Sequence, residues 1–295
     1  MSMISFHIKR PGLSLFHLPS SLFILGIVLL STQLSFAQTA NPSDTLSPLR
    51  VVQKYVSGEK FDDKFKYFCC EMQGEWKTDS TLGEILPARV KRDCKLIFAD
   101  TGHATVDVWM RDSATSKDYY FYLVKDRVWT VYAVRSLLGT ANIENDILSL
   151  DSVPERSRKR YIAQSGNSWQ FEYDNLGLWT SADTVLSENF RKSAKDYDKL
   201  LSYLTKYSSY GKTDSLVNTA MTNKKINKLA KSLLLRDIKY SKKYPDCVFF
   251  LIGGEGDNSV GYLHVRDGKK PPLMTEKHFI MVKSLGNGWY LFKTT

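Results

Sequence analysis

The residues best placed for chemistry lie on one predicted strand and on the aromatic hairpin that follows it. Residues 104–110 alternate between apolar and polar types, so Asp107 shares a face with Trp109. If that face lined a cavity, Asp107 would be its ionisable group and aromatic rings would form its walls, although core packing is the commoner role of such rings. The candidate pocket residues are Asp107, Trp109, Tyr120, Tyr122 and Trp129.

No complete catalytic set accompanies Asp107. His103 is four residues away, which is about 13 Å along an extended strand and too far for a direct hydrogen bond. His264 and His278 have no recognisable nucleophile nearby, and the glycine-rich segment 253–258 lacks the Lys-Ser/Thr ending of a phosphate loop. We therefore predict no catalytic residue, no metal ion and no cofactor, and we expect residues 253–258 to form a flexible β-turn.

Helical spacing comes before the predicted strands. Ser47-Pro48 is typical of an N-cap followed by proline at the first helical position. A second apolar run at helical spacing contains Phe61, Phe65, Phe68 and Met72. Two short helices are therefore expected to precede the alternating segments 95–99 and 104–110.

The first half of the chain resembles a known superfamily. Its hairpin, YYFYLVKDRVWTVYAVRSL, follows helices and alternating strands as in the nuclear transport factor 2-like (SnoaL-like) cone. The resemblance covers roughly residues 47–139. In that superfamily a curved antiparallel sheet wraps around a pocket that binds a small ligand or, in some members, holds an Asp/His acid-base pair. The resemblance implies a concave site and does not imply catalysis.

The second half again places helices before strands. Helical spacing occurs in residues 188–207 and from about 214 to 240, residues 142–150 fit a short helix, and 169–179 fit either a strand or a helix. Four strands are expected at 247–252, 259–265, 278–283 and 289–293, with Asn287-Gly288 as a type I′ turn. The sequence thus predicts an α+β protein, with a nuclear transport factor 2-like cone followed by an α+β domain that ends in a four-stranded antiparallel sheet.

The first 37 residues have the features of an export signal. A basic start precedes the apolar run 22–30, and small residues at 35 and 37 predict cleavage between Ala37 and Gln38. The alternative, a membrane anchor, needs roughly 20 apolar residues, more than this run provides. We expect a mature protein without a transmembrane segment, in the periplasm or secreted, of a Gram-negative-type bacterium. The expected divisions are signal peptide 1–37, polar lead 38–46, and domains 47–151 and 152–295.

Export affects the interpretation of the four cysteines. In an oxidising compartment Cys69 or Cys70 could pair with Cys94, and we take Cys70 with Cys94 as the possible disulfide. The alternative is that all four are buried small hydrophobic residues. No C-x-x-C spacing is present, which disfavours a zinc site.

Positive charge is concentrated in the middle of the chain. Residues 152–243 hold 18 basic and 9 acidic side chains, whereas residues 38–151 hold 15 and 17. Such a segment could bind anionic glycans, lipid phosphates or an acidic partner, or it could be a solvated helix surface. Nucleic acid is not expected as a partner of an exported protein whose aromatic residues are not interleaved with these lysines. The candidate anion-binding residues are Arg158, Lys159, Arg160, Lys224, Lys228 and Lys231.

These features predict an exported, non-catalytic binding or interaction protein of the bacterial envelope, with an unknown small molecule or an envelope protein as its partner. Two alternatives stay open. One is a small-molecule enzyme of the cone superfamily, of the lyase, isomerase or hydrolase type, with a polar pocket around Asp107. The other is an anion- or glycan-binding surface protein that uses its basic middle segment.

Overall fold

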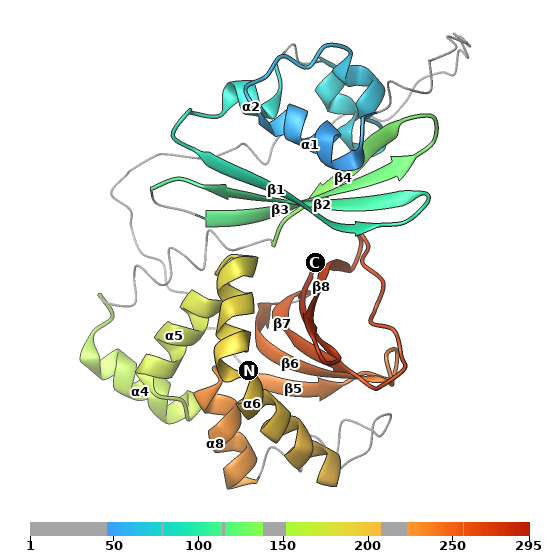
Figure 1. Ribbon diagram of the computed structural model, residues 1–295. Helices are drawn as coiled ribbons and strands as arrows, with labels where there is room; N and C mark the ends of the chain where they lie inside the picture. The colour runs from blue at the N-terminus through green and yellow to red at the C-terminus, as the bar shows by residue number, and fades with distance from the viewer. Residues whose placement is uncertain (1–45, 78–79, 114–115, 138–151, 208–222, 256) are drawn as a thin grey trace, which may run out of the picture. The chain divides into compact units, whose positions relative to one another are not determined.

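The computed structural model describes residues 46–295, except for 78–79, 114–115, 138–151, 208–222 and 256. The predicted signal peptide, its cleavage site at Ala37 and Gln38, and the predicted helix at 142–150 lie outside the described residues. Residues 45–295 form one compact unit. This unit is α+β, with two antiparallel sheets (Figure 1). None of its described helices has the length and apolar character needed to cross a membrane.

The first helix begins where the sequence predicts. Helix α1 spans Pro48–Val56, and the side chain of Ser47 accepts a hydrogen bond from the backbone N–H of Arg50. This confirms the predicted N-cap. Val51 and Val52 on the inner face of α1 are completely buried.

The predicted second helix is wrong. Residues 61–72 fall in an irregular segment with two 3₁₀-helices, Lys64–Tyr67 and Cys70–Lys77. Asp63 and Cys70 each have φ of 58°, a left-handed conformation that interrupts an α-helix. Phe61 and Phe68 are buried, but Phe65 is 55% exposed, so the three rings do not share one face. A one-turn helix α2, Leu82–Ile85, follows and has a capping box at Thr81.

The first sheet has the strand order β1-β2-β3-β4. Its strands are β1 (Lys91–Ala99), β2 (His103–Arg111), β3 (Ser116–Lys125) and β4 (Trp129–Arg135). Strands β3 and β4 form the predicted aromatic hairpin. One face of the sheet packs on α1 (Figure 1), through Val106, Val108, Phe121, Leu123 and Val131. The opposite face carries the candidate pocket residues of β2 and β3.

Four described helices lead into the second sheet. They are α4 (Glu155–Ser165), α5 (Trp169–Trp179), α6 (Asp183–Tyr207) and α8 (Lys224–Ser232). Residues 169–179, which fitted either structure, are therefore helical, and α6 includes the predicted helix at 188–207. The predicted continuation of one helix to residue 240 is wrong. Leu234 has φ of 58°, and the chain then enters strand β5, Asp237–Tyr240.

The second sheet has five strands in the order β5-β6-β7-β9-β8. The four predicted strands are present as β6 (Cys247–Glu255), β7 (Asn258–Val265), β8 (Phe279–Gly286) and β9 (Trp289–Thr294). The predicted count of four was wrong because β5 pairs with the edge of β6. Asn287 and Gly288 have φ of 50° and 77°, as a type I′ turn requires.

The largest hydrophobic core connects the two sheets. Leu186, Phe190 and Tyr197 of α6 pack with Tyr262 and Trp289 of the second sheet. The same core includes Tyr120, Tyr122 and Ala133 from the first sheet. The candidate pocket face therefore contacts the C-terminal half of the chain instead of solvent.

Candidate functional site

A buried group of charged side chains lies where the first sheet meets the C-terminal half. We call Asp107, Asp118, Tyr120, Asp183 and Lys293 the charged cluster. In the antiparallel register Asp107 is opposite Tyr120, and Asp118 is two residues before Tyr120 on β3, so all three share one face. Asp183 is the first residue of α6, and Lys293 lies on β9. Each of the five side chains is less than 10% exposed.

Lys293 binds two carboxylates at once. Its Nζ lies 2.8 Å from Oδ1 of Asp183 and 3.1 Å from Oδ2 of Asp118. The Tyr120 hydroxyl donates to the same Asp183 oxygen at 3.0 Å. The backbone N–H of Asp183 donates to Asp118 Oδ2 at 2.9 Å, which holds the start of α6 against β3. These contacts offset part of the cost of burying Lys293, Asp118 and Asp183 away from water.

Asp107 is the least well compensated member of the charged cluster. One oxygen of Asp107 lies within 4.8 Å of an oxygen of both Asp118 and Asp183, yet its Oδ1 has no hydrogen-bond partner. Burial, followed by repulsion from Asp183 and Asp118, raises the pKa of Asp107 to about 8. Burial also raises the pKa of Asp118, against the opposing effect of Lys293. The protonated form of Asp107 is therefore favoured at neutral pH.

Three carboxylates at this spacing could also hold a hard cation. The Lys293 ammonium already contacts two of them and supplies positive charge at that point. Burial alone would lower the pKa of Lys293, but Asp183 and Asp118 raise it overall, so the ammonium form is favoured. The residues present therefore fit an internal ion-pair network better than a metal site.

The charged cluster leaves little free volume. The Tyr122 hydroxyl donates to the backbone oxygen of Ile280 on β8 at 2.5 Å, and Ala133 is fully buried. The cavity beside Asp118 and Lys293 measures about 20 Å³. That volume accommodates roughly one water molecule. Its walls also include the hydroxyls of Ser116, Ser136, Thr180 and Ser181.

The structure places the five candidate pocket residues on both faces of the first sheet. Asp107, Tyr120 and Tyr122 lie together on the face toward the C-terminal half. Trp109 donates through Nε1 to Ser116 Oγ at 2.7 Å, beside that group. Trp129 lies on the other face, where it packs on the core of α1, with Lys125 Nζ 5.6 Å from its ring centre.

Sequence reasoning missed Asp118, Asp183 and Lys293. Asp118 had a detectable signal, because alternation places it on the same face as Tyr120. Asp183 and Lys293 are 65 and 175 residues distant from Asp118, and no local pattern connects residues at such separations. Their convergence is a property of the tertiary fold.

No family model, curated protein or solved structure matches the chain. The site must therefore be interpreted from its own geometry.

His103 and the four cysteines are not members of the charged cluster, although burial, Asp93 and then Asp107 raise the pKa of the Cys94 thiol to about 11. His103 is exposed at the start of β2, with Nδ1 3.7 Å from Asp100 Oδ1. All four cysteines are free thiols, and the nearest sulfur to Cys69 Sγ is that of Cys70 at 2.9 Å. Cys94 packs against the core of α1, and the Cys70–Cys94 bridge is not formed in this structure.

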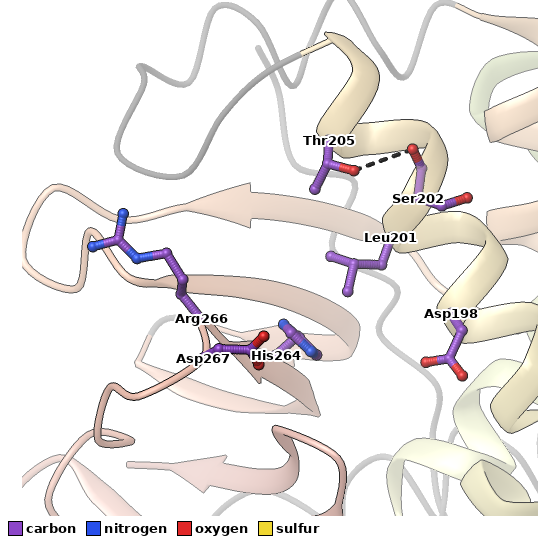
Figure 2. A pocket seen from close by; sticks show the side chains of 7 residues that line it. All are labelled: Asp198, Leu201, Ser202, Thr205, His264, Arg266 and Asp267. Atoms are coloured by element: carbon purple, nitrogen blue, oxygen red, sulfur yellow. Dashed lines mark hydrogen bonds between the residues drawn. The ribbon is translucent and has the colours of Figure 1, made fainter.

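An open depression between α6 and the end of β7 is the second candidate site (Figure 2). It has a volume of about 310 Å³ and is lined by Asp198, Leu201, Ser202, Thr205, His264, Arg266 and Asp267. Asp198 accepts a hydrogen bond from Trp289 Nε1 at 2.9 Å, so its carboxylate is fixed at one side. Burial lowers the pKa of His264, against the opposing effect of Asp267, and so favours the neutral imidazole.

The candidate anion-binding residues lie on α4 and α8. Lys231 Nζ donates to the backbone oxygen of Gly166 at 2.9 Å, which brings the two basic helices together. Arg158 makes intramolecular contacts. Its Nε donates a hydrogen bond to the backbone oxygen of Val153, and its guanidinium lies 5.2 Å from the centre of the Trp169 ring. Lys159 pairs with Glu155 at 2.8 Å. Exposed on these helices are Arg160, Lys224 and Lys228.

Proposed function

We propose that the chain is an exported, non-catalytic binding protein whose ligand binds at its surface. The observation that carries the proposal is the filled face of the first sheet. Tyr120 and Tyr122, which would line a ligand cavity in a nuclear transport factor 2-like cone, use their hydroxyls to bind Asp183 and Ile280. A helix-covered antiparallel sheet supports the resemblance to that superfamily. Its cavity would be closed here by α6 and β8, which provide Asp183 and Ile280.

The charged cluster bears on the rival enzyme hypothesis in two ways. Asp107 does lie beside other titratable groups, as an acid-base site requires. However, a cavity of about 20 Å³ excludes any organic substrate from that position. We therefore assign the charged cluster to joining the two halves of the chain.

The depression of Figure 2 has the chemistry of a site for a small hydroxyl-bearing ligand, such as a sugar unit. Two carboxylates, two hydroxyls and an imidazole line the depression with Leu201, whereas the guanidinium of Arg266 points away from Leu201 and pairs with Asp246. Such a mixture of acceptors and donors matches ligands that both donate and accept hydrogen bonds. The volume of about 310 Å³ is at the lower end of small-molecule sites.

Saturation-transfer NMR with a panel of mono- and disaccharides tests this proposal on the mature protein. We expect at least one sugar to bind, and binding to weaken about tenfold or more in Ser202→Ala and Asp267→Asn, equivalent to at least ~1.4 kcal/mol. Asp126→Asn, in the exposed β3–β4 turn, is the matched control and should bind as the wild type does. Binding that is equally strong in all variants, or absent with every sugar, would contradict the proposal.

The joined basic helices support a second candidate function, which is binding to anionic glycans or lipid phosphates. Helices α4 and α8 together hold eight basic side chains and one acidic side chain. We expect retention on heparin that falls with salt, as electrostatic binding requires. The double substitution Lys224→Glu with Lys228→Glu should abolish retention, whereas Lys95→Glu on β1 should have little effect. Retention unchanged by the double substitution would exclude this function.

A further inference from the structure

The buried contact between Lys293 and Asp183 brings together the two groups that form an amide. The Lys293 amine nitrogen lies 2.8 Å from Asp183 Oδ1, and the two side chains are 5% and 1% exposed. Holding an amine against a carboxyl group in fixed geometry replaces a bimolecular encounter with an intramolecular step. The second oxygen of Asp183, Oδ2, is buried and has no hydrogen-bond partner. It is therefore the oxygen that is free to leave.

We propose that Lys293 and Asp183 condense into an intramolecular amide bond that covalently joins β9 to the start of α6. The Lys293 nitrogen forms a bond to Cγ of Asp183, and the bond from Cγ to Oδ2 breaks. The ammonium and the carboxylate together contain every atom of the products, which are one amide and one water molecule. No oxidant, reductant or other co-reactant is needed.

Asp118 is placed to act as the base. The attacking amine must be neutral, and Asp118 Oδ2 lies 3.1 Å from Lys293 Nζ, close enough to accept its proton directly. Transfer inside the cluster does not change its net charge. It therefore avoids the loss of a proton to solvent, which the raised pKa of Lys293 opposes. Burial raises the pKa of Asp118, which favours the protonated acid that this transfer produces.

Tyr120 and Asp107 complete the proton transfers. The Tyr120 hydroxyl donates to Asp183 Oδ1 at 3.0 Å and so stabilises the negative charge that this oxygen gains during attack. Asp107 has an oxygen within 4.8 Å of both Asp118 and Asp183, so a small side-chain movement lets it pass a proton to the departing Oδ2 and regain one from Asp118. After the attack the nitrogen gives a second proton to Asp118, this proton reaches Oδ2 by the same route, and the bond from Cγ to Oδ2 then breaks with release of water. Two of the three ammonium protons thus leave on water, and the third stays on the amide nitrogen.

A small cavity next to the reacting groups can hold the released water molecule. The cavity of about 20 Å³ is bounded by Asp118 and Lys293 themselves and by four hydroxyl-bearing side chains. A polar space of this size accommodates about one water. Product water can therefore leave the reacting atoms without opening the core.

Intact-protein and tandem mass spectrometry of the mature, denatured protein test the proposal. We expect a mass lower than the sequence mass by one water, and a branched peptide that contains Lys293 linked to Asp183. A mass equal to the sequence mass, a water loss located elsewhere, or a bridge from Lys293 to Asp118 would overturn the proposal. This measurement needs no variant, so it does not depend on whether substituted chains fold.

Substitutions then assign the roles. Asp118→Asn keeps the shape of the side chain but removes the base. We expect this variant to form much less of the amide bridge than the wild type does. Tyr120→Phe should slow bridge formation by about tenfold or more, followed as mass loss after refolding. Asp126→Asn is the control and should form the bridge at the wild-type rate. A full wild-type rate in Asp118→Asn would contradict the mechanism.

Discussion

The hydroxyl of Tyr122 donates a hydrogen bond to the backbone oxygen of Ile280, 158 positions later in the chain, at a distance of 2.5 Å. Tyr122 belongs to the first sheet and Ile280 to the second. The bond lies in the same interface as the charged cluster. The alternation in the sequence places Tyr122 on the candidate pocket face. In the structure this tyrosine belongs to the contact that fills that face.

Removing this hydroxyl should weaken the interface. In Tyr122→Phe a buried carbonyl loses its side-chain donor, and we expect the free energy of unfolding to fall by about 1 to 3 kcal/mol. Urea denaturation followed by tryptophan fluorescence measures the change. Tyr173→Phe removes a hydroxyl from a more exposed tyrosine on α5 and should change stability by less than about 0.5 kcal/mol. Equal losses of stability in the two variants would show that the Tyr122 hydroxyl does not stabilise this interface.

The titration of Asp107 should make stability depend on pH. Burial first, then Asp183 and Asp118, raise its folded pKa to about 8, partly opposed by Lys283 and Lys293. An unfolded aspartate titrates near ~3.9. Between these values the folded state holds a proton that the unfolded state lacks, so the free energy of unfolding decreases as pH rises from about 4 to about 8.

Asp107→Asn removes this titration. We expect a flatter dependence of stability on pH, and at pH 9 a variant more stable than the wild type by about 1 to 3 kcal/mol, because the wild type then buries an unpaired carboxylate. Urea midpoints at several pH values between 5 and 9 measure both effects. Parallel pH profiles for the two proteins would show that Asp107 is not responsible.

Asn175 holds the junction where α8 leads to β5. Its side-chain amide donates to the backbone oxygens of Leu234 and Ile252 at 2.7 and 2.6 Å, and its oxygen accepts from Arg236 Nε. In Asn175→Leu these groups lose their partner, so we expect a loss of about 2 to 4 kcal/mol of stability. Asp174→Ala, on the exposed side of α5, is the control and should have little effect by the same urea titration.

Local patterns predicted the elements whose stabilising contacts are themselves local. Ser47 caps α1, the aromatic hairpin forms, and Asn287-Gly288 makes its turn, because each depends on residues close in the sequence. The strand β5 was missed for the same reason. Its four residues continue an apolar spacing that fits a helix, and only pairing with β6 makes them a strand.

The candidate site was predicted only in part. Alternation placed Asp107 and Tyr120 on one face but could not show what covers that face. Asp183 is a helix-start carboxylate and Lys293 is a lysine in an otherwise apolar strand, and both are ordinary until the fold brings them together. The sequence therefore predicted only part of the site's lining, because the residues that close the site come from the second half of the chain.

Two glycines in helices should respond to alanine in opposite directions. A Cβ at Gly83 of α2 would lie 1.6 Å from the backbone oxygen of Ser57, so we expect Gly83→Ala to destabilise the protein by more than about 2 kcal/mol. A Cβ at Gly177 of α5 would meet nothing within 4 Å, and alanine there should stabilise by about 0.5 to 1 kcal/mol. Thermal denaturation of both variants measures these changes in stability. A stable Gly83→Ala protein would contradict it.

The central claim is that the C-terminal half fills the pocket face of the first sheet. Thiol labelling at Ala133 measures this most directly, because this residue is fully buried on that face and next to Tyr122 in the register. Ala133→Cys is made in a chain without Cys69, Cys70 and Cys94, with native Cys247 as the buried reference. Asp126→Cys in the same background is the exposed reference.

We predict that the thiol introduced by Ala133→Cys reacts as slowly as that of Cys247, and at least about a hundredfold more slowly than the thiol introduced by Asp126→Cys, since reaction then requires unfolding. Labelling of the Ala133→Cys protein at the rate of the Asp126→Cys protein, while Cys247 stays protected, would show an open cavity and contradict the account.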